Sequence, residues 1–362
     1  MIAMPNETGN ISAAAKPTPA LDNAAIAELL AAESPRTDPP LRNALRRASR
    51  RALLWPEEAS QLLSEGRSLR ELSGIGPHLE RLILEWMEHP PAFDPPPETR
   101  SGFLTLVQAR AALRKVPSWI QRVRGDLQTH TLWSDGSDSI EAMAQAAEER
   151  GYEYIAITDH SQGLKIAGGI TEDELREQRA EIDAINDANQ HAGRRVRILR
   201  SIELNLDPRG EGDMSAASLG ELDIVLGCFH SSLRRQDDQT ERYERALRNP
   251  QVQILGHPQG RIYNHRLGLK ADWARVFAVA AQLDKAIEID SYPDRQDLRP
   301  DLVQLAKESG CRISVATDAH DPSQLDLMEF GLASALLAGI EPERIVNFMT
   351  YGQLLAWIES LR

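Results

Sequence analysis

The chain has 362 residues, of which 41% are hydrophobic and 26% are charged, with 54 acidic and 41 basic side chains. This composition excludes collagen, long coiled coils and disordered chains, and no run of about 18 apolar residues is present that could cross a membrane. The N-terminus lacks the apolar core of a signal peptide, and two cysteines are too few for a disulfide framework. We therefore expect a cytoplasmic globular protein with one large domain or two unequal ones.

Charge is distributed unevenly along the chain. Residues 1–124 carry 16 basic and 14 acidic side chains, whereas residues 125–362 carry 25 basic and 40 acidic side chains. The acidic part would repel phosphate groups unless bound cations changed the local field. The N-terminal part contains five arginines in LRNALRRASRR, residues 41–51, which form either a solvated helix face or a phosphate-contacting one.

The predicted domains follow from changes in composition. Residues 1–20 have no hydrophobic period and predict a disordered tail. Apolar residues then recur every three or four positions over residues 21–88, which predicts a small all-helical domain. HPPAFDPPPET, residues 89–99, contains five prolines and begins a linker that continues through a connecting helix to residue 123. The second predicted domain covers residues 124–362.

The second domain alternates short β-rich runs with helical stretches. Such alternation predicts parallel strands joined by crossover helices, and seven runs indicate an α/β barrel rather than an open sheet. The runs are residues 125–131, 152–160, 196–206, 222–230, 252–258, 285–291 and 312–320.

Five of the nine histidines lie at the carboxyl ends of these predicted strands, and carboxylates lie beside them. Because those ends converge on one face of a barrel, the side chains should meet in one pocket. A single strand-end histidine is usually structural, but this many together with carboxylates predict a site for two or three zinc, manganese or iron ions. The histidines are His130, His160, His230, His257 and His320, and the carboxylates are Asp126, Asp135, Asp159, Glu203 and Asp318.

The order of motifs identifies a family resemblance. Residues 125–362 resemble a PHP (polymerase and histidinol phosphatase) domain, and most of all the C-terminal PHP domain of bacterial family X DNA polymerases. The motifs that carry the resemblance are GDLQTHTLWSDG, TDH, IELN, CFHSS, GHPQGR and TDAH. The resemblance implies a distorted (β/α)7 barrel with a trinuclear metal centre.

The same resemblance implies nine metal ligands. The first ion would be held by Gln128 or water, His130, Glu203 and Asp318; the second by Glu203, His230 and His257; and the third by Asp135, His160 and His320. Glu203 would bridge two ions, and Glu203, His257 and Asp318 would be catalytic. Gln128 stands where the general motif has histidine, which implies a looser first ion. Manganese is favoured because oxygen ligands replace imidazole, with zinc or iron as alternatives.

Four basic residues are candidates for holding substrate phosphate near the predicted metal centre. Arg261 is the leading one, because it directly follows GHPQG and a guanidinium can bind phosphate through two hydrogen bonds. Lys165, Arg209 and Arg295 are equally compatible with ordinary surface positions. Asp159, in TDH, is expected to orient its neighbours rather than to bind metal.

The helical domain carries a motif of its own. SLRELSGIGPHLERLILEW resembles a helix-hairpin-helix module, in which Gly74, Ile75 and Gly76 would contact DNA phosphates without reading sequence. The alternative is a hairpin that serves packing alone, since Glu80 stands where the module usually has a small residue. Residues 1–124 are too few for a polymerase palm and lack its paired aspartates, so we do not expect polymerisation.

Together these features predict a metal-dependent phosphoesterase that acts on DNA, as a 3′-to-5′ exonuclease or a 3′-end-processing enzyme of DNA repair. One alternative is a small-molecule phosphatase of the histidinol-phosphatase type, whose substrate is a phosphorylated metabolite. A second alternative is a non-catalytic DNA-binding scaffold with a structural metal centre. No membrane partner is expected.

Overall fold

The computed structural model describes residues 21–92 and 95–362, so the predicted disordered tail, residues 1–20, lies outside the described residues. The N-terminal region is all-helical, as predicted. Its buried apolar side chains, among them Ile26, Leu30, Leu45 and Leu62, form a core separate from that of the barrel. The helices are α1 (Asn23–Glu33), α2 (Pro39–Ala52), α3 (Ala59–Ser64) and α4 (Pro77–Glu88).

A tight turn joins a short 3-10 helix, Leu69–Glu71, to α4. Gly74 adopts the left-handed conformation, with φ at 86°, and Gly76 caps the N-terminus of α4. The side chain of Arg51, on α2, lies directly against this turn, because a Cβ on Gly74 would come 2.7 Å from its Cδ. The hairpin is therefore backed by a basic side chain of α2.

The second domain is a barrel of parallel strands. One sheet has the order β1-β2-β3 and the other the order β4-β5-β6-β7-β8, and every strand pair is parallel. Bridges from His160 to Glu203 and from Thr129 to Ala319 join the two sheets at both edges. The strands are β1 (Gly125–Asp126), β2 (Tyr154–Ile157), β3 (Arg197–Arg200), β4 (Glu203–Leu206), β5 (Leu226–Phe229), β6 (Ile254–Leu255), β7 (Ala286–Asp290) and β8 (Arg312–Ala316).

The predicted strand over residues 196–206 is divided in the structure. Its first half, β3, pairs with β2, and its second half, β4, pairs with β5. The change of partner interrupts the pairing at Ser201 and Ile202, so seven predicted runs give eight strands. The α/β barrel prediction is confirmed.

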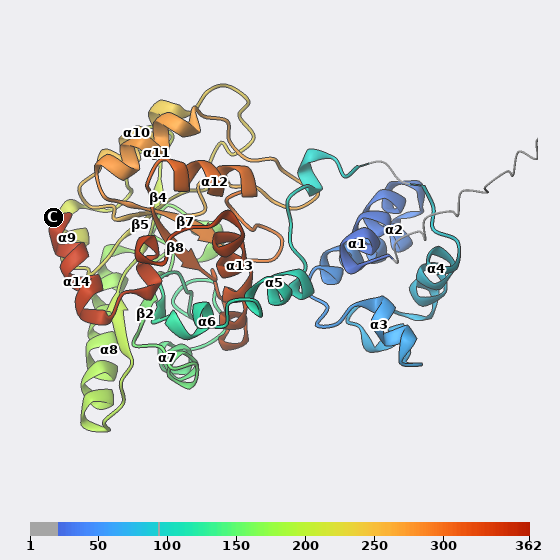
Figure 1. Ribbon diagram of the computed structural model, residues 1–362. Helices are drawn as coiled ribbons and strands as arrows, with labels where there is room; N and C mark the ends of the chain where they lie inside the picture. The colour runs from blue at the N-terminus through green and yellow to red at the C-terminus, as the bar shows by residue number, and fades with distance from the viewer. Residues whose placement is uncertain (1–20, 93–94) are drawn as a thin grey trace, which may run out of the picture.

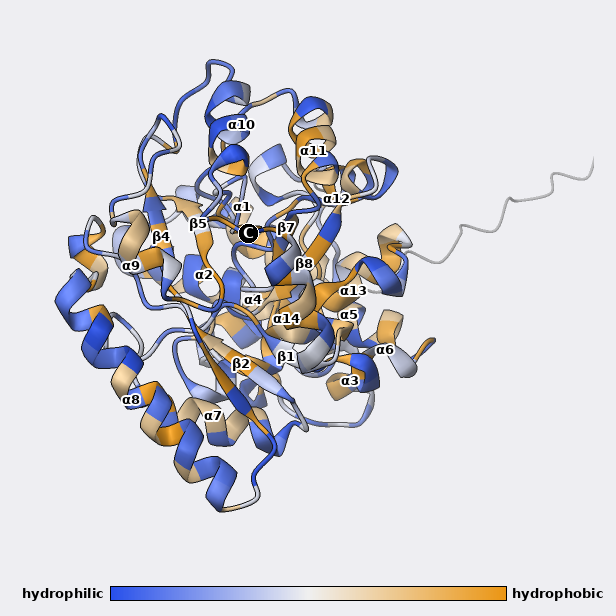
Figure 2. Cartoon of the chain, turned by 90° about the vertical axis from the view of Figure 1, so that its left-hand side faces the viewer, coloured by the Kyte–Doolittle hydropathy of each residue, from blue (hydrophilic) through white to orange (hydrophobic). Residues whose placement is uncertain are grey.

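Helices surround the strands on the outside (Figure 1). Figure 2 shows apolar strands inside and hydrophilic outer faces on helices such as α8. No helix of the described residues is long and apolar enough to span a membrane. The barrel helices are α7 (Ile140–Glu149), α8 (Glu172–His191), α9 (Ala216–Gly220), α10 (Thr240–Arg248), α11 (Trp273–Gln282), α12 (Pro300–Glu308), α13 (Met328–Ala338) and α14 (Tyr351–Ser360).

The last helix closes one end of the barrel. Trp357 of α14 donates its indole N–H to the carbonyl of Asp284, just before β7, over 2.9 Å. Arg362 donates to the carbonyl of Asp223, just before β5, over 3.1 Å. Because α14 covers the amino ends of the strands, the open face of the barrel lies at their carboxyl ends.

The N-terminal domain lies beside the barrel and contacts loops from that open face (Figure 1). The hydroxyls of Ser49, on α2, and Tyr263, after β6, share a 3.0 Å hydrogen bond. Tyr263 is buried with the N-terminal core, and Phe103 meets its ring edge-on at 5.1 Å. The tyrosine thus anchors the strand-end loop in the other domain.

The segment between the two domains is well packed. The predicted connecting stretch contains α5 (Leu106–Leu113) and α6 (Ser118–Arg122), which bury Ala109, Leu113 and Trp119 against the barrel core. Arg100 donates to both carboxylate oxygens of Glu28, on α1, over 2.6 Å each. It also donates to Asn264, beside Tyr263, over 2.8 Å. One guanidinium therefore links the linker, α1 and the barrel.

Replacing Arg100 by methionine should loosen this docking. Glu28 is only 11% exposed, so its carboxylate would lose its partner in a partly buried place, at an expected cost of about 2–3 kcal/mol. Urea unfolding and chymotrypsin cleavage after Phe93, within residues 89–99, measure the effect. Arg36→Met, which removes a pair from an arginine that is 72% exposed, is the matched control. Equal behaviour of the two variants would contradict the docking role.

Candidate metal centre

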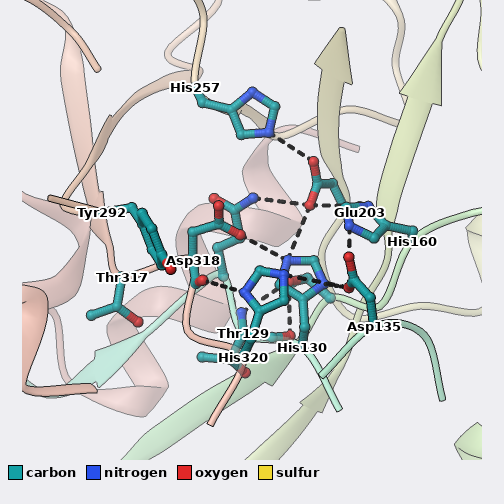
Figure 3. A network of polar contacts seen from close by, with 12 residues as sticks. Thr129, His130, Asp135, His160, Glu203, His257, Tyr292, Thr317, Asp318 and His320 are labelled. Atoms are coloured by element: carbon teal, nitrogen blue, oxygen red, sulfur yellow. Dashed lines mark hydrogen bonds and ion pairs between the residues drawn. The ribbon is translucent and has the colours of Figure 1, made fainter. Parts of the chain in front are cut away.

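Glu203 lies at the centre of the polar cluster at the carboxyl ends of the strands (Figure 3). It opens β4 and is fully buried. Its Oε1 lies 2.8 Å from Nε2 of both His230 and His257. Its Oε2 lies 3.2 Å from Nε2 of His130 and 3.4 Å from Nδ1 of His160. One carboxylate therefore meets four imidazoles that come from four different strand ends.

Two aspartates complete the cluster on either side of His130. Nε2 of His130 lies 2.9 Å from Oδ1 of Asp318. Oδ1 of Asp135 lies 3.5 Å from Nε2 of His160 and 3.4 Å from Nε2 of His320. The rings of His130 and His320 stack at 4.4 Å between their centres. The structure thus brings the residues predicted for the three ions into one cluster.

Gln128 also reaches this cluster. Its side-chain N–H donates to Oε2 of Glu203 over 3.0 Å, and its Oε1 is buried without a hydrogen-bond partner. The residue is fully buried, so this free oxygen has no access to solvent. An oxygen in this position is available to an ion, and the ligand role of Gln128 stays a prediction.

The arrangement of donor atoms fits divalent metal ions. Ligand atoms of these residues lie within 4.8 Å of one another in four overlapping groups of three or four. Both ring nitrogens of His130 and Nδ1 of His160 are buried and make no hydrogen bond of acceptable geometry. Buried polar atoms left unpaired are costly, and metal coordination satisfies them. Imidazole and carboxylate donors suit zinc, manganese and iron.

Charges within the cluster favour ligand-ready carboxylates. Burial on its own raises the pKa of Glu203, but the histidines around it hold that pKa well below its usual value. The pKa of Asp135 is lowered in the same way against burial, by His160 and His320. Burial lowers the pKa of His257, but the Glu203 carboxylate outweighs it and brings that pKa to about 9. Carboxylates that stay ionised are the form that binds metal.

Asp159 holds the loop that carries two candidate ligands, His130 and Asp135. It is fully buried and accepts from the backbone and the hydroxyl of Thr131 over 2.8 and 2.7 Å. It also accepts from Ser134 over 2.5 Å and from Gln178 over 2.7 Å. With its oxygens occupied in this way, Asp159 is placed to orient the loop, and its orienting role stays a prediction.

Two candidate ligands adopt strained backbone conformations. The φ angle is 22° at His257 and 52° at Asp318, both in the region that favours glycine. Such conformations cost about 1–3 kcal/mol each and persist where the surroundings enforce them. Three backbone N–H groups after His257 donate to Asp297, and the one from Gly260 does so over 2.6 Å. Asp297 therefore fixes the loop that positions His257.

Two further buried carboxylates were not singled out from the sequence. Glu288, in β7, accepts from the backbone N–H of His257 over 2.6 Å. Asp290 ends the same strand, and burial raises the pKa of both groups well above their usual values. The sequence carried a signal for these two buried carboxylates, because AIEID, residues 286–290, places two acids at alternating positions of an otherwise apolar run. Cys228 is a buried thiol that lies beside Glu203 and His257.

The four predicted phosphate-binding residues occupy different surroundings. Arg295 follows β7 and forms an ion pair with Oδ2 of Asp318, and it lies 3.6 Å from Oδ2 of Asp290. Arg261, the leading candidate from sequence, points elsewhere. Its guanidinium donates to the carbonyl of Ser101 over 2.8 Å and lies 3.9 Å from the ring centre of Phe103. The preference for Arg261 is therefore corrected in favour of Arg295.

The physical reason for this correction is the course of the loop after His257. Its backbone turns toward Asp297 and then enters the domain interface, which carries Arg261 into contact with the linker. Lys165 and Arg209 are exposed on the loops after β2 and β4, so their roles stay predictions.

Comparison with known proteins agrees with this geometry. The family model for the PHP domain matches residues 126–317, which is more than half of the chain. The chain belongs to the PHP family. Membership of this family and the metal-binding cluster identify the chain as a metal-dependent phosphoesterase.

Relatives within the PHP family fall into two kinds. The DNA polymerase/3′-5′ exonuclease PolX of Bacillus subtilis is 36% identical over 239 residues, which cover 66% of this chain and 41% of that protein. A probable phosphatase of Caldanaerobacter subterraneus is 32% identical over 250 residues, covering 66% of this chain and 91% of that protein. The PHP chain thus spans well under half of the polymerase and most of the phosphatase.

A solved structure that is similar to this chain is that of histidinol phosphate phosphatase from Lactococcus lactis, complexed with zinc, L-histidinol and phosphate. It matches 60% of this chain and 94% of its own at 16% identity, with a TM-score of 0.44. That similarity is too low to support an argument about activity.

Glu203→Gln should reduce the metal content of the purified PHP protein by at least one ion per chain. The substitution removes one of the two ionised oxygens through which the four histidines are brought together. Atomic emission spectroscopy on dialysed protein measures the content. Glu211→Gln, an exposed change on the loop after β4, is the control and should leave it unaltered. Identical contents would show that Glu203 binds no ion.

Asp159→Asn should weaken manganese binding by about 10- to 100-fold, because the loop from His130 to Asp135 loses its orienting acceptor. Competition against a fluorescent chelator gives the affinity. Asp173→Asn, on a carboxylate that is 82% exposed, controls for the change of charge. An affinity within twofold of the wild type would remove Asp159 from the orienting role.

Proposed function

We propose that this PHP protein hydrolyses phosphoesters at the 3′ ends of DNA, as a 3′-to-5′ exonuclease or 3′-end-processing enzyme, in the cytoplasm and in DNA repair. The observation that carries the proposal is the placement of the helix-hairpin-helix region. Its α2 helix contacts the loops at the open face of the barrel through Ser49 and Tyr263. A DNA-binding module and a phosphoesterase centre would then share one face.

The proposed ligands are the nine residues predicted from sequence. Gln128, His130, Glu203 and Asp318 would hold one ion, Glu203, His230 and His257 a second, and Asp135, His160 and His320 a third. Manganese is the proposed ion, because each of the three ligand sets contains a carboxylate, and the first also contains the amide oxygen of Gln128. When bound, such ions bind phosphate oxygens and lower the pKa of water toward neutrality.

The protein's own groups would complete the site. Arg295 is one-third exposed and pairs with Asp318, so its free N–H groups can donate to a substrate phosphate beside the ions. Glu203, His257 and Asp318 would be the catalytic residues, with Glu203 shared between two ions. Glu288 fixes the backbone of His257 and so holds that imidazole toward Glu203.

The hairpin would hold the DNA backbone. Gly74, Ile75 and Gly76 form the turn that precedes α4, whose first N–H groups face away from the helix and suit an anion. Arg51 lies against this turn and adds a positive charge. Glu80, the departure from the usual motif, accepts from Ser68 over 2.5 Å, which partly satisfies its carboxylate.

A second candidate function is a phosphatase that acts on a small phosphorylated metabolite. It is supported by the probable phosphatase of Caldanaerobacter subterraneus, because the match covers 91% of that protein without requiring a DNA-binding module. In this case the N-terminal helices would serve packing. The two candidates differ in substrate and share the proposed metal centre.

The test uses metal-stripped protein supplied with manganese. The substrates are labelled oligonucleotides ending in 3′-hydroxyl or 3′-phosphate, and histidinol phosphate in parallel. We expect stepwise shortening or release of the 3′-phosphate, and His320→Ala should reduce the rate by about 100-fold or more because it removes a ligand. His191→Ala, on the exposed end of α8, is the matched control.

The outcomes separate the candidates. Turnover of histidinol phosphate with no oligonucleotide product would favour the phosphatase candidate. No metal-dependent turnover of either substrate would contradict both.

A further inference from the structure

A row of basic side chains leads from the hairpin to the metal centre. It consists of Arg51, Arg50, Arg234, Arg266 and Arg295, and these residues are called the arginine path below. They come from α2, from the loops after β5 and β6, and from the loop after β7. The acidic net charge of residues 125–362 makes such a row unexpected on this part of the chain.

The first half of the path crosses the domain interface. Arg51 lies against Gly74 of the hairpin. Arg50, the next residue along α2, is about half exposed, and its guanidinium lies 3.8 Å from Asp294 of the barrel. Ser49 anchors the same turn of α2 to Tyr263. The arginines of α2 are therefore held beside the loop that follows Tyr263.

The second half runs along that loop toward the ions. Nη2 of exposed Arg234 lies 2.7 Å from Nε2 of His265. An arginine can only donate, so Nε2 accepts and the proton of this histidine lies on Nδ1, available to a ligand. The charges of Arg234, Arg266 and Arg50 add to burial in lowering the pKa of His265.

The last step reaches the proposed ligands. The backbone N–H of Ile262 donates to the carbonyl of Arg266 over 2.9 Å, and that of Tyr263 donates to the carbonyl of Asp294, the residue before Arg295, over 2.7 Å. The loops that carry Arg266 and Arg295 are therefore hydrogen-bonded to each other. Arg295 contacts Asp318 directly. The ring of Tyr292 stands beside Asp318 in Figure 3, and the Arg295 guanidinium lies 5.7 Å from its centre. Arginines followed by an aromatic ring are typical of surfaces that bind single-stranded nucleic acid.

Close packing of like charges has an energetic cost that a polyanion relieves. Asp294 is a carboxylate along the path, and Asp290 and Asp318 meet Arg295 at its end. Arg51 and Arg266 have no ion pair with a carboxylate among the described residues. Phosphates spaced along one strand would supply the missing negative charges in a row.

We propose that the arginine path binds the backbone of a single DNA strand and directs its end from the hairpin into the metal centre. The inference rests on the proposed function, because it assigns the route by which that DNA substrate arrives. A single strand fits better than a duplex, since most residues of the cluster that would receive it are buried.

The test is binding of a 5′-fluorescein oligothymidylate of about 20 nucleotides, followed by anisotropy in the presence of a chelator. The variant is Arg50→Gln/Arg234→Gln in the full chain. Because each phosphate contact on a single strand contributes about 0.7 to the salt slope, we expect the slope to fall by about 1.4 and binding at 0.1 M salt to weaken roughly 10- to 30-fold. Arg50→Lys/Arg234→Lys should restore most of the affinity.

The charge-matched control is Arg176→Gln/Arg194→Gln, on α8 and the loop after it, where both arginines are exposed. Thermal unfolding verifies that each variant is folded. Binding by the Arg50/Arg234 variant within twofold of the wild type, or an equal loss in the control, would overturn the path.

The proposed function is judged separately, from the wild type alone. Wild-type protein that binds the oligonucleotide through these arginines but releases no product with manganese would contradict the proposed function and support the path. If the wild-type protein shortens DNA and the Arg50→Gln/Arg234→Gln variant binds DNA as tightly as the wild type, the proposed function is supported and the arginine path is contradicted.

Discussion

The buried carboxylate of Glu203 is the constraint on which the site depends. A single ionised group, closed off from water, is compatible with folding only if opposite charges surround it. Four histidines from separate strand ends lie within 3.4 Å of its two oxygens, and bound cations held by these residues would supply the opposite charge. The barrel must therefore close accurately, because a shift of one strand would remove a partner from Glu203. The bridge from His160 joins the sheets at Glu203 itself, and the bridge from Thr129 to Ala319 joins them at the opposite edge.

Docking of the two domains is the second organising feature. The linker does not simply span a gap, because Arg100 ties it to α1 and to the loop after β6. That loop begins at His257, a proposed ligand, and contains Tyr263 at the interface. The same short segment therefore contributes to the centre at one end and to domain contact at the other. This connection gives the helical domain a fixed place relative to the open face.

Much of the site was predictable from sequence, since polar residues at the carboxyl ends of parallel strands must converge. His130, His160, His230, His257 and His320 could be gathered on this rule without knowing any distance. The rule fails for loops. Arg261 and Arg295 each follow a strand by a few residues, and only the turn of each loop decides that Arg295 meets Asp318 while Arg261 meets Phe103. The pairing of Ser49 with Tyr263, 214 residues apart, leaves no local signal either.

The shared tyrosine has a consequence for how chains of this kind can change over evolutionary time. Tyr263 belongs to the barrel by sequence and to the helical core by burial. A descendant that lost its first hundred residues would leave this ring without the helical core and the Ser49 hydroxyl that it contacts now. Gene shortening would therefore have to be accompanied by substitutions in the loop after His257. The boundary between the domains is simple to draw along the sequence, but loss of one domain at that boundary would disrupt the packing of the other.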